Sequence, residues 1–538
     1  MEEGDYREQL GFESDFPQNE WDVKRQTGYI VGREPVLFLD DSYILDREGV
    51  ERSLHPLSKE PDPVTFPLPF EGIRIPIVRS IVPATDQRWF YAYVSGGYGD
   101  KTLFMLYRTR DCVDFRPVEV NQLSREEISS QLGRTEIAFN NLLIFDEEHG
   151  RKFPPYYCAF FRVYHDTDYA YEGVVINKNP RPRVARVIRS RDGINWEEKP
   201  DQPRKKVSFE SNMPAYDAFR DRYLLYLRLW DPPKKPVSGW RKVLLSQTGA
   251  EDPVAGWTDE ELVLEADELD GAAADIYFMQ VTGYAGIYVG IPAIYQRTSC
   301  FDPSLRGTIH GQLAVSGDGR SWSRVCQGEQ FLVLGEEGSW DSGLISPACA
   351  PVILGEELIY YYSGRRIRHD EPLPEDYSRG CGLARLRLDG FASLDAGPIG
   401  GTVLTVPFWP EGKYLYINGD ASEGEIRVEV LQDYTYVELK KFERGESGKG
   451  LFRAEKCVPL NENSTCHRVE WENGENFIDD FPAGWNRPKS SDDLKGMLHF
   501  SERAIGLRFY LRNAKLYSFW FAESEGPPEE GRLKPAES

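Results

Sequence analysis

The chain has 538 residues, 40% of them hydrophobic, so it exceeds one typical domain and can bury a large core. Its 87 Asp and Glu residues against 64 Lys and Arg leave a net charge of −23, a field that repels nucleic acid and anionic membranes, so neither is expected as a partner. No stretch approaches the ~20 apolar residues of a membrane span and no signal peptide is visible, so we expect a cytoplasmic protein, or a secreted one if a leader was removed.

Residues 1–65 are polar apart from one strand-like run at 35–45, and prolines recur from 56 to 69. Proline locks the backbone dihedral φ and favours extended chain. We therefore expect an N-terminal arm and strand that lie over the module that follows.

Residues 66–405 repeat a β-rich unit. Two heptapeptides mark the repeat, Ser190-Arg-Asp-Gly-Ile-Asn-Trp196 and Ser316-Gly-Asp-Gly-Arg-Ser-Trp322, and they lie about two periods of roughly 65 residues apart. Each follows a β-rich run, and Asp-Gly suits a tight hairpin because glycine takes positive φ without steric cost. Degenerate copies stand at 109–115 and 246–257, and a last hairpin stands at 384–390. Five such units predict a five-bladed β-propeller.

The repeat of β-rich units does not continue after residue 405. Residues 406–522 carry short alternating strands between turns, which is typical of a β-sandwich. The tail at 523–538 is rich in Glu, Pro and Gly and is expected to be disordered. Helical periodicity is scarce, and only 124–132 predicts a short helix. The fold class is therefore all-β, a propeller followed by a sandwich.

An acid stands at the start of each predicted blade. The five acids are Glu71, Glu136, Glu210, Asp275 and Asp341. The innermost strands of a propeller converge on a central channel, so these carboxylates are expected in one funnel, where like charges crowd and push their pKa values apart. Each precedes an apolar strand, where an unpaired charge would be costly. For each acid taken singly, a rim charge or a salt bridge is the structural alternative.

Cleavage of a glycosidic bond needs two such carboxyl groups, one that protonates the leaving oxygen and one that acts as nucleophile or activates water. Nearby side chains suit sugar binding: Tyr277 and Trp340 by stacking, and Asn140, Asn141, Asn212 and Gln280 by hydrogen bonds to hydroxyls. The alternatives are packing between blades for the aromatic rings and bonds to the main chain for the amides.

Several phrases resemble those of bacterial proteins grouped as glycoside hydrolase family 32 N-terminal-like. They are Leu37-Phe-Leu-Asp-Asp-Ser-Tyr-Ile44, Asp275-Ile-Tyr-Phe-Met-Gln-Val281, Trp340-Asp-Ser-Gly-Leu-Ile345, and the segments 382–394 and 415–430. The resemblance covers residues 36–520 and implies a five-bladed propeller plus a β-sandwich that acts on or binds carbohydrate. The invertase-type motifs Trp-Met-Asn-Asp-Pro-Asn-Gly, Arg-Asp-Pro and Glu-Cys are missing. The related family 43, with three axial acids, is easier to reconcile with Glu136, Asp275 and Asp341.

We therefore expect a glycoside hydrolase with an oligo- or polysaccharide substrate. The alternative is a carbohydrate-binding propeller without catalysis, and a protein-interaction propeller is disfavoured because the blades lack a WD-type signature. The sequence carries no signal for an oligomeric state. The eight cysteines form no Cys-x-x-Cys pair, which favours buried free thiols. No cofactor and no metal-binding motif is expected, although a divalent cation such as calcium at the axis, held by His165, His310 or His369 with carboxylates, is an alternative.

Overall fold

The computed structural model describes residues 30–522 except 100, 121, 123, 133–136, 144–156, 164–167, 177–182, 200–203, 208–212, 219, 231–239, 249–255, 272, 300–305, 373–378, 433–451 and 473–504. Two compact units divide the chain: Leu54–Phe391, and a second unit that combines the described parts of Met1–Ser53 and Ala392–Pro528. The predicted tail at 523–538 lies outside the described residues.

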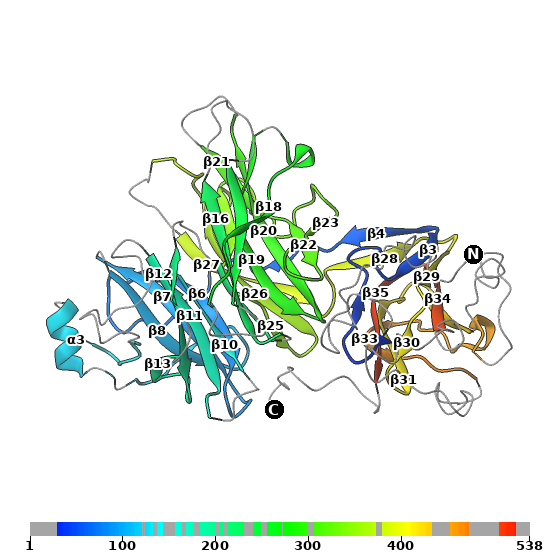
Figure 1. The fold of residues 1–538 in the computed structure, drawn as a ribbon, viewed down its shortest axis with the longest axis horizontal. Coiled ribbons are helices and arrows are strands. Elements are labelled where there is room, and N and C mark those ends of the chain that lie inside the picture. The colour runs from blue at the N-terminus through cyan, green and yellow to red at the C-terminus, as the bar shows by residue number, and fades with distance from the viewer. Residues whose placement is uncertain are drawn as a thin grey trace, which may run out of the picture. The chain divides into compact units, whose positions relative to one another are not determined.

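Antiparallel groups of strands follow one another along the unit Leu54–Phe391 (Figure 1). Group one contains β6 (Arg74–Pro83), β7 (Phe90–Tyr98), β8 (Lys101–Thr109) and β9 (Arg116–Pro117). Group two contains β10 (Tyr157–Arg162), β11 (Tyr171–Ile176), β12 (Arg183–Ser190), β13 (Trp196–Glu198) and β14 (Lys205–Val207). Group three contains β15 (Met213–Asp217), β16 (Arg222–Trp230), β17 (Arg241–Gln247) and β18 (Glu261–Leu264).

Two further groups share the largest sheet of this unit, joined by a single parallel pair, Ile309 beside Leu344. Group four contains β19 (Ala274–Tyr284), β20 (Ile287–Arg297), β21 (Gly307–Gly311), β22 (Leu313–Ser316) and β23 (Ser323–Val325). Group five contains β24 (Leu344–Pro347), β25 (Val352–Leu354), β26 (Glu357–Arg365) and β27 (Arg379–Arg387), and β5 (Ser58–Lys59) pairs with β27 as its outermost strand. The segment just before residue 66 therefore completes the last group.

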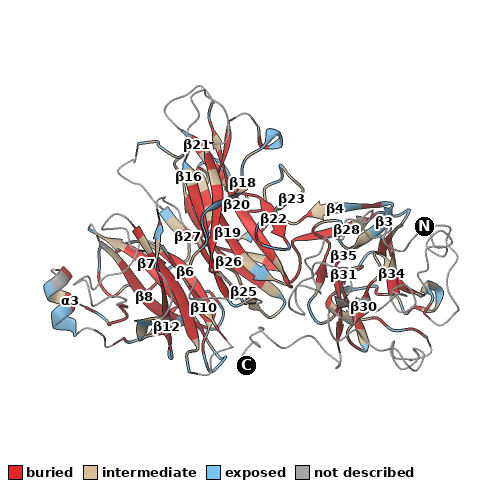
Figure 2. Cartoon of the chain, in the orientation of Figure 1, coloured by how far each residue is buried: buried red, intermediate tan, exposed pale blue. Residues whose placement is uncertain are grey.

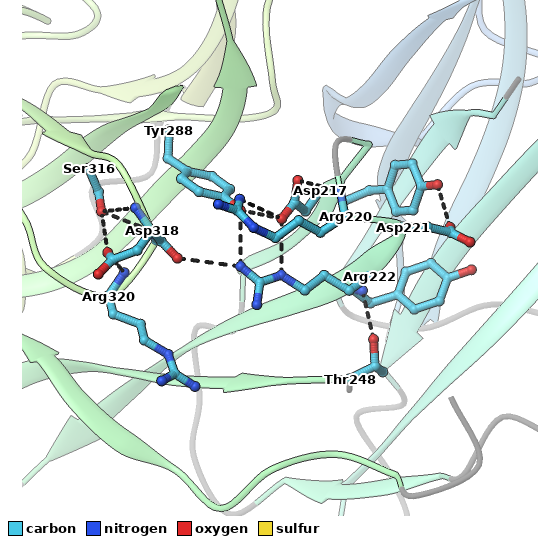
Figure 3. A network of polar contacts seen from close by, with 12 residues as sticks. Asp217, Arg220, Asp221, Arg222, Thr248, Tyr288, Ser316, Asp318 and Arg320 are labelled. Carbon is cyan, nitrogen blue, oxygen red and sulfur yellow. Dashed lines mark hydrogen bonds and ion pairs between the residues drawn. The ribbon is translucent and has the colours of Figure 1, made fainter. Parts of the chain in front are cut away.

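The two heptapeptides form the turns that lead into β13 and β23, as the sequence predicts. In the first turn, Asp192 Oδ1 accepts hydrogen bonds from the main-chain N–H of Ile194 and of Asn195, both at 2.8 Å, and Gly193 has φ +76°. The second turn repeats this geometry around Asp318. The main-chain oxygen of Asp318 also accepts a hydrogen bond from Arg222 Nη2 at 3.4 Å (Figure 3). Such a φ favours glycine, which explains the Asp-Gly pair.

Hydrogen bonds from tyrosine hydroxyls link these turns to neighbouring groups of strands. Tyr93 on β7 donates its hydroxyl hydrogen bond to Gly193 O at 2.8 Å, and Tyr226 on β16 donates to Gly319 O at 2.9 Å. Tyr361 on β26 donates to Cys112 O at 2.6 Å, in the degenerate copy at 109–115. Because β26 belongs to group five and Cys112 follows β8 of group one, this bond joins the last group to the first.

The second unit consists mainly of two antiparallel sheets with one shared core. One sheet contains β2 (Val36–Leu37), β4 (Val50–Leu54), β28 (Ala392–Ala396), β31 (Tyr414–Asp420), β33 (Asn463–Arg468) and β35 (Ala514–Ala522). The other contains β3 (Ile44–Glu48), β29 (Gly401–Thr405), β32 (Glu425–Gln432) and β34 (Ile505–Arg512). A short parallel pair, β1 (Ile30–Val31) with β30 (Trp409–Pro410), forms a separate two-stranded sheet. Phe38, Phe509 and Phe519 meet in the core with ring centroids 5.5–6.2 Å apart.

The units differ from the predicted ranges at two places. Strands β28 and β29, expected to end the repeat region 66–405, pair instead with β35 and β34 of the second unit. Part of the predicted arm at 1–65 also belongs to the second unit, while β5 belongs to the first. Both differences arise because the strands pair across long sequence separations.

Several other expectations agree with the structure. The described residues are almost entirely strand and connection, with the predicted short helix as α3 (Arg125–Leu132). Figure 2 shows that burial concentrates on the strands of both units. The seven cysteines in the described part of the chain are free, five of them buried. No helix among the described residues is long and apolar enough to cross a membrane.

Candidate active site

In groups three, four and five of the unit Leu54–Phe391, the connection at one end is longer than the connection at the other end. In an antiparallel group, the start of the first strand and the connection between the second and third strands lie at the same end. In group five, that connection spans 366–378, whereas the connection at the opposite end, between β25 and β26, spans only 355–356. Long connections on a rigid scaffold are where binding residues concentrate. We call this end the loop end.

A small cavity lies where the five groups meet. Its volume is about 80 Å³, and each group contributes one segment to its lining: residues 79–81, 158–161, 213–216, 280–282 and 348–350. The first four segments belong to β6, β10, β15 and β19, the first strand of each group, and the fifth follows β24. Gln280, a predicted sugar-binding residue, is among the lining residues. The first strands therefore surround one common space.

Asp275 lies at the start of β19, at the loop end, and is completely buried. It accepts a hydrogen bond from the main-chain N–H of Trp240 at 2.7 Å and one from Arg241 Nη1 at 3.1 Å. Arg297 Nε lies 3.4 Å from the same carboxylate. The described charged partners of Asp275 are thus two arginines, not the ring of acids that the sequence predicts. These contacts are those of a buried salt bridge, which is the structural alternative given above for each acid.

Further side chains surround this carboxylate. The hydroxyl of Tyr277 lies 3.0 Å from His369 Nε2. The guanidinium carbons of Arg228 and Arg241 lie 4.5 and 5.2 Å from the centre of the Tyr277 ring. Asp275, Tyr277, Arg228, Arg241, Arg297 and His369 are called the Asp275 cluster below. Its members come from groups three, four and five, so three separate groups of strands converge at the loop end.

The arginines of this cluster were not predicted from the sequence. Arg228 and Arg241 stand near the loop-end termini of β16 and β17, and Arg297 ends β20. No motif surrounds them, and single arginines at strand ends are common on exposed surfaces. Their burial, 8%, 4% and 2% exposed, depends on packing between the groups and has no local signal.

Asp341 has a different environment from the one predicted. It is 3% exposed, forms an ion pair with Lys59 Nζ at 2.7 Å, and accepts a hydrogen bond from Tyr362 at 3.0 Å. Lys59 is on β5, the outermost strand of group five, so the carboxylate pairs with the outer part of the group, and it does not line the cavity. Trp340 stacks on Tyr362 with ring centroids 5.7 Å apart and an interplanar angle of 18°.

The remaining predicted residues divide into three kinds. Glu136, Glu210 and Asn212 lie outside the described residues. Glu71 is exposed in the turn before β6. Asn140 and Asn141 are buried beside β8, not on a first strand: Leu106 N–H donates to Asn141 O at 2.9 Å, and Asn141 Nδ2 donates back to Leu106 O at 3.3 Å. For Asn141 the structural alternative, an amide that bonds the main chain, is confirmed.

The described residues do not fit the alternative of a divalent cation at the axis. The part of the cavity lining that the structure describes contains no carboxylate but does contain the guanidinium-bearing Arg79. Within the described ranges, no group of three or more His, Cys, Asp or Glu side chains is arranged to hold a metal ion. His310 is on β21, and its burial together with the charge of Arg324 lowers its pKa to about 4. His165 lies outside the described residues.

No protein-family model and no curated protein matches this chain. Among solved structures, the chain is similar to an N-acetylgalactosamine deacetylase from F. plautii, with 14% identity and a TM-score of 0.39 over 64% of this chain and 97% of that one. It is also similar to a protein of the GH130 family of mannoside phosphorylases, a family that contains glycoside hydrolases that target β-1,2 mannosidic linkages in Candida mannan. The identity is 10% and the TM-score 0.40, over 62% of this chain and 94% of that one. A third is the α-L-arabinofuranosidase PaAbf62A from Podospora anserina, with 11% identity and a TM-score of 0.39 over 62% and 98%. All three TM-scores are below 0.5, so the function of this chain is argued from its own residues.

Proposed function

We propose that Leu54–Phe391 is a five-bladed β-propeller and that the second unit is a β-sandwich. Three observations support the propeller. Five antiparallel groups follow one another, each contributes a segment to one cavity, and the bond from Tyr361 to Cys112 joins the last group to the first. Strand β5 precedes the first blade in the chain but pairs with β27 of the last blade. A strand shared in this way can close the ring of blades. Two sheets around one core support the sandwich.

We propose that the chain is a glycoside hydrolase whose substrate binds at the loop end, above the cavity. The observation that carries this proposal is the Asp275 cluster: a completely buried carboxylate between two arginines, next to the Tyr277–His369 pair, at the end with the long connections. A buried ion pair adds little net stability compared with apolar packing, and ionisable groups gather where chemistry is done.

The burial of Asp275 decides its role in this proposal. A carboxylate with no exposed surface does not reach a substrate, so Asp275 is a positioning residue that orients Arg241 and Arg297. The two reacting carboxyl groups are then Glu136 and Glu210. One protonates the oxygen of the departing sugar, and the other attacks the anomeric carbon or removes a proton from the water that does so. Water supplies the hydroxyl and the proton that appear in the two products.

A panel of aryl glycosides and of plant and algal oligosaccharides tests the activity. On any substrate that is turned over, Glu136→Gln and Glu210→Gln should each lower kcat by about 10²–10⁴-fold, because each removes a proton donor or acceptor while keeping the shape. Glu71→Gln is the matched control, since Glu71 is exposed in a turn. Loss of activity in Glu71→Gln, with activity kept in the other two variants, would contradict the assignment.

One observation favours a carbohydrate-binding propeller without catalysis. Three of the five predicted acids are described: Asp275 and Asp341 are engaged in buried ion pairs with cationic side chains, and Glu71 is exposed in a turn. In a binding protein, such pairs would hold the loop end rigid without chemistry. Saturable binding of a glycan by calorimetry, with no turnover of any member of the panel, would establish this function instead.

A further inference from the structure

Arg79 is placed by an irregularity in the first blade. The register between β6 and β7 shifts between Val78 and Ser80, so Arg79 is the extra residue of a β-bulge. A bulge changes the direction of a side chain, and Arg79 is one of the residues that line the cavity. Its Nε donates a hydrogen bond to Ser95 Oγ at 2.7 Å on the neighbouring strand β7. This bond anchors one side of the guanidinium group, and its other N–H donors have no hydrogen-bond partner among the described residues.

Arg79 is the only charged side chain among the described residues that line the cavity. The two cysteines of the lining are neutral: burial raises the pKa of Cys158 to about 12, although Arg79 acts in the opposite direction, and burial also raises the pKa of Cys349. The other described lining residues are apolar or uncharged, such as Gln280. Arg79 is half-buried, so its guanidinium group is partly removed from water and lies beside this space without a described carboxylate, an arrangement that favours a bound counter-charge.

The size of the cavity limits what can supply this charge. Its volume is about 80 Å³, and one water needs roughly 10–15 Å³ measured in this way, so there is room for one small ion and a few waters. Sites for organic ligands occupy about 300–1,000 Å³, so a sugar ring does not fit. A divalent cation is excluded by the charge of Arg79. The remaining class is a small inorganic anion.

We propose that the cavity is a chloride site, in which the ion binds Arg79 and the side-chain amide of Gln280. Arg79 comes from blade one, Gln280 from blade four, and the rest of the lining from all five blades. An ion that binds the folded state alone stabilises it in proportion to its occupancy, so chloride would stabilise the assembled ring. The proposal stands independently of the glycosidase activity.

Thermal melts of the full chain test the site. Titration of sodium chloride, with sodium gluconate replacing it to hold ionic strength constant, should raise Tm by a saturable 1–3 °C or so. Arg79→Gln should abolish this rise, whereas Arg88→Gln should keep it, because Arg88 is an exposed arginine of the turn between β6 and β7. An equal rise in Arg79→Gln, or no difference between chloride and gluconate, would overturn the proposal.

A crystallographic measurement on the unmodified protein covers the case in which Arg79→Gln fails to fold. Crystals grown or soaked with sodium bromide should show an anomalous peak in the cavity, within hydrogen-bond distance of the Arg79 guanidinium. Bromide replaces chloride in such sites and scatters anomalously. A cavity without a peak at molar bromide would overturn the proposal whatever the variants do.

Discussion

Two buried aspartates differ in position and not in environment, and we propose a functional role only for Asp275. Asp275 and Asp217 are both completely buried, and each is paired with two arginines. Asp217 ends β15, away from the loop end, and accepts hydrogen bonds from Arg222 and Tyr288 (Figure 3). Asp275 begins β19 at the loop end. Asp275 therefore lies at the end of the unit where we propose that the substrate binds, and Asp217 lies at the opposite end.

Asp275→Asn should lower both activity and stability. The neutral amide leaves Arg241 and Arg297 with an uncompensated buried charge, which costs about 3–5 kcal/mol of unfolding free energy. The crowding of acids that the sequence predicts would make the loss of this charge favourable, but the described charged partners of Asp275 are arginines. The same change frees the two arginines from their oriented positions, so kcat should fall by about 10²-fold or more. Chemical denaturation and kinetics well below Tm measure the two effects separately.

Asp217→Asn is the matched control for this variant. It should lose a similar amount of stability, because its carboxylate is equally buried and equally paired, yet keep nearly normal kcat at a temperature where it is folded. An equal loss of kcat in both variants would show that the activity of Asp275→Asn falls through stability alone. Normal kcat in Asp275→Asn would remove Asp275 from the site.

His310 should make the folded state sensitive to acid. Burial and the charge of Arg324 lower its pKa from 6.5 to about 4. The unfolded chain therefore gains this proton near pH 6.5 and the folded chain only near pH 4, so stability is lost as the pH falls through that window. The loss approaches about 3 kcal/mol at pH 4. Melts from pH 7.5 to 4.5 should show a shallower decline in His310→Asn than in the wild type, and identical slopes would contradict the lowered pKa.

Among the elements, the turns that follow the third strands are hydrogen-bonded to neighbouring groups of strands. A tyrosine from the second strand of one group donates to a turn carbonyl of another group, at Gly193, Gly319 and Cys112. The turn repeats because its hydrogen bonds are local, but the tyrosine partners are about 93–249 residues away in the chain. Each bond is therefore a link between elements that form independently.

Tyr361→Phe and Tyr226→Phe should each lower the free energy of unfolding by about 1–2 kcal/mol. Both hydroxyls are buried, so their removal leaves a carbonyl oxygen without its partner. Tyr414→Phe is the control, because the Tyr414 hydroxyl makes no hydrogen bond that is described. Urea unfolding of the three variants measures the difference, and a loss no larger in Tyr361→Phe than in Tyr414→Phe would mean that the bond to Cys112 does not stabilise the ring.

At the scale of the whole molecule, a fragment 54–391 should fold and a fragment 66–405 should not. The second fragment lacks β5, so Asp341 loses Lys59 and remains as a buried, uncompensated charge. It also carries β28 and β29 without their partners β35 and β34, which exposes apolar strand faces. Soluble yield and a cooperative thermal transition compare the two. A folded fragment 66–405 together with an insoluble fragment 54–391 would contradict this division.

The full chain truncated after Thr405 should also be insoluble, because β28 and β29 again lack their partner strands.

The sequence by itself determines the all-β class, the repeat, the Asp-Gly turns and the helix α3, because each depends on residues close together in the chain. The position of Asp275 at the start of a strand was predictable for the same reason. The charged partners of Asp341 and Asp275 were not predictable: Lys59 and Asp341 are 282 residues apart, and Arg241 and Asp275 come from different groups of strands. Local chemistry sets turns and strand periods, whereas the burial and charge pairing of a side chain depend on which strands pack beside it. Only the tertiary structure, by pairing β5 with β27 and β29 with β34, decided the boundaries of the units and placed Arg79 without a described counter-charge in the cavity.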